Sequence, residues 1–281
     1  MKTMHLTMVC ALVWCVGGIA WGDVISIGPE KDNTLFGAVF DDLSSGVGAG
    51  VYAGRIGPNG EPNVLRRALM KFDVSGLPAG ASITGVRLLV QVTASPNDIA
   101  YDFDLHRVLS DWGEEGSSSQ GGAGAPAEPG DATWFHTFWS SASWATPGGD
   151  FTAASSGMTS MATAGPYVFE SEGMRDDVAY WLAHPKENFG WIVLGNEIEE
   201  KSARRLGSRE EPAEASRPIL EITFDAGAVP GDFNGDGVAN GADLGLMLAA
   251  WNACDACPED MNGDGTVNGA DLGLFLIAWT G

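Results

Sequence analysis

Apolar and polar residues alternate in several short runs of residues 23–226, and this alternation predicts β-strands. The period of two is clearest in residues 86–93, 101–106 and 220–224. Because successive side chains of a strand point to opposite faces, each run predicts a strand with one buried face. Further strands are expected at residues 24–27, 51–55, 68–72, 189–194 and 203–207, and one helix at 174–184. Residues 23–226 therefore predict a mainly β domain, a jelly-roll-like β-sandwich.

A different period appears near the C-terminus. Apolar residues recur there at i, i+3, i+4 and i+7, the spacing of one face of an α-helix. The pattern occurs twice: Leu244, Met247, Leu248 and Trp251, then Leu272, Phe275, Leu276 and Trp279. The offset is 28 residues, and residues 232–251 differ from 260–279 at five of twenty positions. This duplication predicts two helices that pack as a pseudo-twofold pair in one small domain, residues 232–281.

A twelve-residue acidic loop precedes each of these helices. Each loop has oxygen side chains at positions 1, 3, 5, 9 and 12, glycine at position 6 and a backbone carbonyl at position 7, as in an EF-hand-like Ca²⁺ loop. Val229, Pro230 and Gly231 cannot form an entering helix, so each unit is a loop followed by one helix. The sequence therefore predicts two Ca²⁺ ions, with the ligands Asp232, Asn234, Asp236, Val238, Asn240, Asp243, Asp260, Asn262, Asp264, Thr266, Asn268 and Asp271.

With these loops and helices the segment resembles a type I dockerin, the calcium-binding partner of cohesin modules in secreted polysaccharide-degrading systems. The resemblance implies an α-helical, EF-hand-like dockerin domain that docks to a cohesin-type protein. In that family, loop positions 10 and 11 and the start of each helix contact the cohesin. The corresponding residues are Gly241, Ala242, Leu244, Gly269, Ala270 and Leu272. The alternative is a stabilising Ca²⁺ module that has no partner.

Residues 1–22 have the organisation of a cleaved secretory signal peptide, with an apolar run at 6–20 followed by small residues. The sequence therefore predicts a secreted, extracellular protein. No other stretch of about eighteen apolar residues predicts a membrane span. In an exported chain, the spacing of Cys254 and Cys257 predicts a disulfide.

Two segments are predicted to lie outside the packed cores of the domains. Residues 227–231 are a short linker between the domains, and residues 113–130, rich in Ser, Gly and Pro, predict a flexible insertion.

The charge of the chain changes which partners are expected. The formal net charge is −22, and residues 230–281 contain eight carboxylates and no lysine or arginine. Such acidity disfavours nucleic acid and anionic membranes as partners. Two Ca²⁺ ions would offset half of the charge in the C-terminal domain, so we expect its folding to depend on calcium.

Nine short stretches of the larger domain carry a second resemblance: 32–35, 53–55, 66–72, 105–108, 111–114, 131–134, 148–151, 189–191 and 208–210. Through them, residues 32–224 resemble the DNRLRE family of β-sandwich domains, which is related to carbohydrate-binding modules of secreted bacterial proteins. The resemblance implies a noncatalytic domain that associates with glycans.

Aromatic and arginine side chains provide candidate sugar contacts. Sugar rings lie flat on aromatic faces while their hydroxyls bond to polar neighbours, and guanidiniums suit acidic sugars. The candidate carbohydrate-binding residues are Trp112, Trp134, Trp139, Arg66 and Arg67, of which Trp134 and Trp139 are expected to be exposed. The alternative is that the aromatic residues fill the core and the arginines pair with glutamates.

Catalytic motifs have little support in this sequence. It contains no Gly-x-Ser-x-Gly elbow and no His-Glu-x-x-His pair. We therefore expect a secreted, noncatalytic, carbohydrate-associated protein whose dockerin docks to a cohesin-type partner in extracellular polysaccharide degradation. Two alternatives stay open: a polysaccharide lyase or glycoside hydrolase carried by the dockerin, and a structural surface or adhesion protein.

Overall fold

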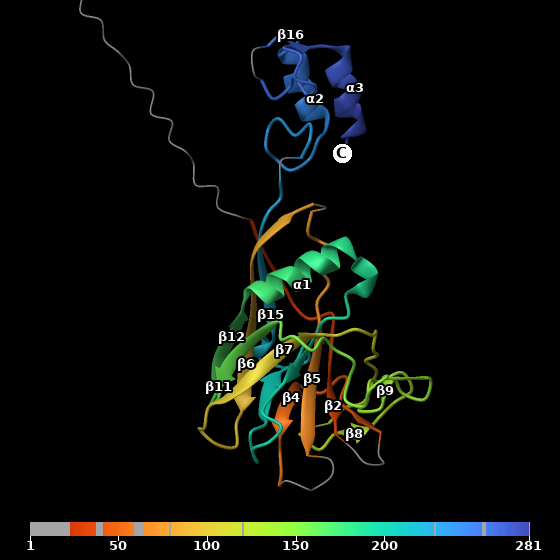
Figure 1. Ribbon diagram of the computed structural model, residues 1–281, viewed down its shortest axis with the longest axis vertical. Coiled ribbons are helices and arrows are strands. Elements are labelled where there is room, and N and C mark those ends of the chain that lie inside the picture. Colours follow the sequence, from red (N-terminus) through yellow and green to blue (C-terminus); the bar gives the residue numbers. More distant parts are fainter. Residues whose placement is uncertain are drawn as a thin grey trace, which may run out of the picture.

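The structure is a computed structural model that describes residues 23–37, 42–58, 64–78, 80–119, 121–227, 229–254 and 257–280. The predicted signal peptide, residues 1–22, lies outside the described residues. Figure 1 shows a large β part and, in blue, a C-terminal part with two helices. Among the described residues, no helix has the length and apolar character needed to cross a membrane.

The strands of the β part are β1 Asp23–Ile27, β2 Lys31–Phe36, β3 Leu43–Ser44, β4 Gly50–Arg55, β5 Leu65–Lys71, β6 Ser82–Ala94, β7 Tyr101–Arg107, β8 Ala125–Pro126, β9 His136–Phe138, β10 Ala142–Ser143, β11 Gly157–Met161, β12 Gly165–Glu170, β13 Trp191–Leu194, β14 Arg204–Gly207 and β15 Ile219–Asp225. Its helices are α1 Glu172–Ala183 and the single-turn 3₁₀ segments η1 Pro185–Glu187 and η2 Glu214–Ser216. Each strand expected from the alternation overlaps one of these strands, so the prediction of a mainly β chain is confirmed.

Eleven of these strands form one curled antiparallel sheet, in the order β1-β15-β6-β14-β4-β5-β13-β7-β11, with β12 beside β6 and β2 beside β5. Strand β4 joins its two halves, because Ala53 pairs with Arg204 of β14 and Gly54 pairs with Arg66 of β5. The two layers expected from the sequence are thus halves of a single sheet that curls around the core.

The main core lies inside this curl and is closed by α1. The N-terminus of the helix is capped by Ser171, whose hydroxyl accepts a hydrogen bond from the Met174 N–H at 3.1 Å. Met174, Val178 and Trp181 are fully buried on one face of α1, which lies against β6. The rings of Trp181 and Trp191 pack with centroids 4.6 Å apart. The helix predicted at 174–184 is confirmed.

A second core lies beneath the long connection between β7 and β11. It contains Leu35, Leu69, Val108, Trp112, Ala132, Trp144 and Ile192. The sequence suggested that the insertion at 113–130 makes no packing contacts, but part of it is packed. Its strand β8 pairs with β3, and the buried Ser117 hydroxyl accepts a hydrogen bond from the Gly46 N–H at 3.0 Å. The prediction of a flexible insertion is therefore wrong for this packed portion.

The C-terminal part contains α2 Gly241–Ala249, β16 Asn252–Ala253, β17 Thr266–Val267 and α3 Gly269–Ile277. Its small core is formed by Ala239, Met247, Val267 and Phe275, all fully buried. The two repeats contribute to this core together, because Phe275 of α3 stacks on Phe233 before α2, with ring centroids 5.8 Å apart.

Candidate metal centre

The first loop is organised by the Asp232 carboxylate at its start. Oδ1 accepts hydrogen bonds from the N–H groups of Gly235 and Asp236 at 2.7 and 3.1 Å, and Oδ2 accepts one from Gly237 at 2.8 Å. Gly237 has φ 88°, a left-handed conformation that favours glycine. The sharp turn predicted at position 6 is present.

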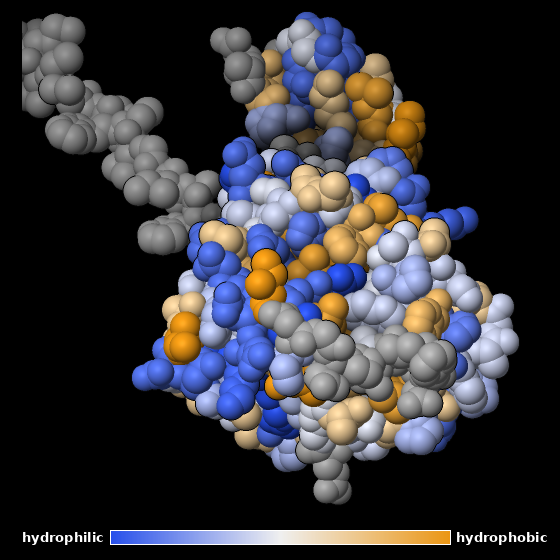
Figure 2. All heavy atoms as spheres, turned by 60° about the horizontal axis from the view of Figure 1, so that its bottom comes forward, coloured by the Kyte–Doolittle hydropathy of each residue, from blue (hydrophilic) through white to orange (hydrophobic). Residues whose placement is uncertain are grey.

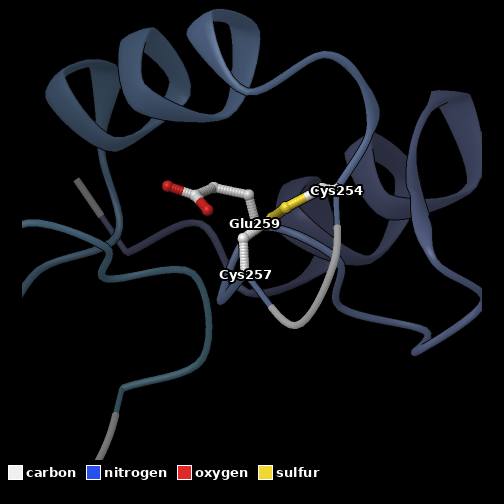
Figure 3. A group of neighbouring side chains, drawn as sticks. All are labelled: Cys254, Cys257 and Glu259. Atoms are coloured by element: carbon white, nitrogen blue, oxygen red, sulfur yellow. A yellow bond between two sulfur atoms is a disulfide. The ribbon is translucent and has the colours of Figure 1, made fainter. Parts of the chain in front are cut away.

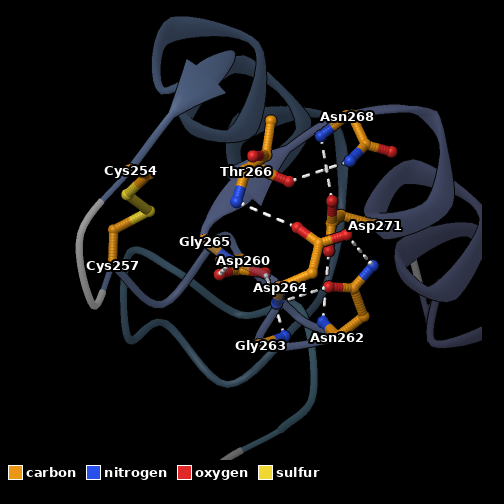
Figure 4. Close-up of a disulfide and its surroundings, with 10 residues drawn as sticks. All are labelled: Cys254, Cys257, Asp260, Asn262, Gly263, Asp264, Gly265, Thr266, Asn268 and Asp271. Atoms are coloured by element: carbon orange, nitrogen blue, oxygen red, sulfur yellow. Dashed lines mark hydrogen bonds between the residues drawn. A yellow bond between two sulfur atoms is a disulfide. The ribbon is translucent and has the colours of Figure 1, made fainter.

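The second loop repeats this arrangement (Figure 4). Asp260 accepts hydrogen bonds from the N–H groups of Gly263, Asp264 and Gly265 at 2.9, 3.2 and 2.7 Å. Gly265 has φ 85°, close to the value at its counterpart Gly237. The sequence duplication is thus a duplication of loop geometry.

The carboxylates at position 12 connect each loop to its helix. Asp243 is fully buried and accepts hydrogen bonds from the N–H groups of Phe233, Asn234 and Asn240 at 2.9, 3.1 and 2.9 Å. These bonds, chiefly that from Asn240, hold the pKa of Asp243 below its ordinary value. Asp271 is also buried, and its pKa is lowered chiefly by the hydrogen bond from Asn268. Both groups are therefore carboxylates at neutral pH.

The two asparagines at position 9 cap the helices. The side-chain Oδ1 of Asn240 accepts a hydrogen bond from the Ala242 N–H at 2.8 Å, and Oδ1 of Asn268 accepts one from the Ala270 N–H in the same way. Each cap is completed by the position 12 carboxylate as a capping box. The structure thus gives these asparagines a capping role, and their role as metal ligands stays a prediction.

The carboxylates of the first loop converge. Oxygen atoms of Asp232, Asp236 and Asp243 all lie within 4.8 Å of one another. Among the described residues, the equivalent three carboxylates of the second loop do not form such a group. The donors of both loops are all oxygen atoms, which is the chemistry that a hard cation such as Ca²⁺ prefers. The residues present fit Ca²⁺, the first loop more closely than the second.

Cys254 and Cys257 form a disulfide with Cα atoms 5.8 Å apart. They lie near Glu259 (Figure 3), but sulfurs bonded to each other offer no thiolate to a metal. The disulfide instead contacts the second loop. The Cys254 N–H donates to the Gly265 carbonyl, and the Asp260 N–H donates to the Cys257 carbonyl, both at 3.2 Å. The cross-link is therefore attached to loop positions 1 and 6.

Burial along the two helices is the same, position by position. From 240 to 251 and from 268 to 279, corresponding residues fall in the same class of exposure throughout. Of the residues that the dockerin resemblance implied, Gly241, Ala242, Gly269 and Ala270 are exposed, while Leu244 and Leu272 are half-buried. The periodic stripe is only partly buried, because Leu248 and Leu276 remain 54% and 56% exposed.

Further apolar residues of these helices, outside the stripe predicted from the sequence, are also exposed. Leu246 and Leu274 are each 40% exposed, and Ile277 is 84% exposed. Figure 2 shows hydrophobic atoms, in orange, on one side of the C-terminal part. The signal in the sequence was the Leu-Gly-Leu triplet in both copies, which places apolar residues outside the i, i+3, i+4 stripe.

The candidate sugar contacts do not gather on one surface. Trp112 is fully buried, and its Nε1–H donates to the Phe189 carbonyl at 2.9 Å. Arg66 is 2% exposed and its guanidinium lies 4.9 Å from the centre of the Phe36 ring. Neither side chain presents a surface to a ligand, so these two predictions are corrected.

The remaining candidates are half-buried. The Arg67 guanidinium lies 4.8 Å from the centre of the Trp134 ring and pairs with Glu197 at 2.7 Å. Trp139 is half-buried as well, so neither tryptophan is as open as expected. The arginines pair mainly within the protein, for example Arg205 with Glu211 at 3.0 Å, as the alternative interpretation held.

Comparison with known proteins gives no family to which the chain can be assigned. No family model matches its sequence, and no curated protein matches it. The class that the fold and the site define is therefore a mainly β protein with a duplicated acidic loop–helix unit.

Proposed function

We propose that residues 232–280 form a dockerin-like module that binds two Ca²⁺ ions and docks to a cohesin-type partner outside the cell. The observation that supports this proposal is the matching exposure of apolar side chains on two helices that follow matching loops. A monomer with no partner gains nothing from leaving leucines at equivalent positions of both helices in water.

The exposed residues define a docking face on each helix. Ala242, Leu246 and Ala249 follow one another at i, i+4 and i+7, so they lie along one side of α2, and all three are exposed. On α3 the same positions are occupied by Ala270, Leu274 and Ile277, also exposed. These two docking faces include the loop position 11 alanines that the dockerin resemblance implied. Two near-identical docking faces would let one partner bind in two orientations.

The chain's own residues prepare the loops for Ca²⁺. Asp232 and Asp260 hold the backbone of each loop in its turn, and Asp243 and Asp271 join the loop to the first turn of the helix. Ca²⁺ would supply the positive charge that lets several carboxylates approach one another. Because each loop is bonded to its helix, ordering of the loops orients the docking faces.

For the β part, we propose a noncatalytic, carbohydrate-associated role within extracellular polysaccharide degradation. Support comes from the half-buried Trp134, whose aromatic ring is of the kind that sugar rings pack against. Retention on alginate and on sulfated glycans, compared with cellulose and xylan, tests this role. Trp134→Ala should release the protein from whichever polymer retains it, and unchanged retention would contradict the assignment.

Calcium titration calorimetry on residues 23–281 tests the loops. Asp232→Ala and Asp260→Ala should each remove one bound equivalent relative to the parent protein, and the double variant should remove two. If the double variant binds as many ions as the parent, the loops are not calcium sites.

Docking is tested by capture on a panel of immobilised cohesin modules with calcium or with chelator. Leu246→Arg or Leu274→Arg alone should leave binding through the other helix, whereas the two together should abolish it. The matched control is Leu248→Arg with Leu276→Arg, because these leucines lie on the opposite flank of the buried stripe. Capture that survives in Leu246→Arg/Leu274→Arg would exclude the docking faces defined above.

A further inference from the structure

A second cluster of carboxylates lies in the β part, far along the sequence from the acidic loops. Asp32 is on β2, Glu114 follows β7, and Glu210 follows β14. One carboxylate oxygen of each side chain lies within 4.8 Å of one oxygen of each of the other two. Asp32 has no exposed surface, and the side chains of Glu114 and Glu210 are 8% and 25% exposed.

Hydrogen bonds hold this cluster in place. Asp32 Oδ2 accepts from the Arg209 N–H at 2.7 Å, and Glu114 Oε1 accepts from the Asp32 N–H at 3.0 Å. The Arg209 guanidinium lies 2.9 Å from both Glu114 Oε2 and Glu210 Oε1. The carboxylates are therefore positioned before any ligand arrives.

Two oxygen atoms of the cluster have no hydrogen-bond partner among the described residues. Asp32 Oδ1 and Glu210 Oε2 are buried and accept no hydrogen bond. Buried polar atoms are rarely left in this state, because the loss of water must be compensated. An unpartnered oxygen on a fully buried side chain, within a few ångström of two further carboxylates, points to a cationic ligand.

The charges around the cluster indicate what kind of cation fits. Three carboxylates face one guanidinium, that of Arg209, and the nearby Lys31 is paired with Asp111 at 2.9 Å. With all three carboxyl groups ionised, the charge left over is two negative units, which one divalent cation balances. Donors that are all oxygen, with neither sulfur nor imidazole, suit Ca²⁺ better than zinc or copper.

We propose that Asp32, Glu114 and Glu210 bind a divalent cation of the calcium type, at a third site that is independent of the two acidic loops. Such an ion would join β2 to the start of the 113–130 insertion and to the turn after β14. Glu114 lies 82 positions from Asp32 and 95 from Arg209 along the chain, and hydrogen bonds connect it to both residues. The ion would therefore strengthen a junction between segments that are distant in sequence.

The test uses residues 23–281 with Asp232→Ala and Asp260→Ala, so that the acidic loops no longer compete for the ion. Ca²⁺ titration by calorimetry, and Tb³⁺ luminescence excited through tryptophan, should both report one remaining equivalent. Asp32→Asn and, separately, Glu210→Gln should each weaken this binding at least tenfold. The matched control is Glu211→Gln, because Glu211 is adjacent in sequence but pairs with Arg205 instead.

Each outcome decides the proposal. Binding lost in Asp32→Asn or Glu210→Gln and retained in Glu211→Gln supports the third site. Since Glu210 is partly exposed, its variant decides the matter if Asp32→Asn fails to fold. No binding at millimolar Ca²⁺, or binding that is unchanged in Glu210→Gln, overturns it and leaves a cluster that holds protons only. Neither result bears on the loops, which are already disabled in this background.

Discussion

Phe275→Ala should unfold the C-terminal part in chelator while leaving the β part intact. Phe275 is fully buried on α3, stacks on Phe233 at 5.8 Å and meets Trp279 edge-on at 5.5 Å. Truncating a buried phenylalanine costs about 3–5 kcal/mol. A core as small as this one supplies no more than about 3–5 kcal/mol. The substitution therefore removes as much free energy of unfolding as the calcium-free module has.

Calcium should restore part of this stability. Each occupied site adds about 2.7 kcal/mol when the free ion is at a hundred times its dissociation constant. Hydrogen exchange measured by mass spectrometry on residues 23–281 separates the two parts of the chain. We expect peptides from both α2 and α3 to lose protection in chelator and to regain it in calcium, since both helices pack on the same four buried side chains.

The matched control is Leu276→Ala, the next residue in the chain, whose side chain is 56% exposed. Its effect on the free energy of unfolding should stay within about 0.5 kcal/mol. If α2 keeps its protection in Phe275→Ala under chelation, the two repeats do not share one core and the reasoning fails.

Three further predictions concern separate features. Replacing Cys254 and Cys257 by serine should weaken calcium binding at the second loop and leave binding at the first loop unchanged. The entropy of the short closed loop limits the loss of binding free energy to about 2 kcal/mol. Equal losses at both loops in calorimetry would contradict this. In chelator, the β part should lose stability as the pH rises from about 4.5 to about 7, because burial raises the pKa of Glu114 to about 7 and the folded state then binds the proton more tightly. Thermal melts of Glu114→Gln should show a smaller slope, with the remainder due to Asp32, whose pKa burial also raises, and a slope of unchanged size would assign it to another group. Ser171→Ala should lower the stability of the β part by about 1 kcal/mol through loss of the α1 cap, and no change in the melting midpoint would show that the cap is dispensable.

Strands with regular alternation could be predicted from the sequence, and strands that bury polar groups could not. The runs within β6, β7 and β15 alternate apolar and polar residues, so their buried faces were evident. Strand β2 was missed because Asp32, Asn33 and Thr34 are fully buried in succession. Side-chain hydrogen bonds, such as that from Ser45 N–H to Asn33 at 3.1 Å, make this burial tolerable. Such partners come from distant segments, and no local pattern reveals them.

The convergence of the first loop's carboxylates could be predicted because their spacing is local, whereas the carboxylate cluster of the β part could not. Asp232, Asp236 and Asp243 fall within twelve residues, and their spacing alone implies convergence. Asp32, Glu114 and Glu210 meet only because the sheet curls and the insertion folds back on β2. The prediction of Trp112 as a sugar contact was wrong for a related reason, because Trp112 fills the second core.

Helices α2 and α3 contain more apolar side chains than their small core can bury. A nine-residue helix presents about two and a half turns, and α2 and α3 each bury a single apolar side chain fully, Met247 and Phe275. The small core leaves Leu246, Leu248, Leu274 and Leu276 exposed. Their exposure at matching positions would cost solubility in a chain that acts alone. The proposal assigns only the docking faces to a partner, so the paired substitution of Leu246 and Leu274, set against that of Leu248 and Leu276, tests it.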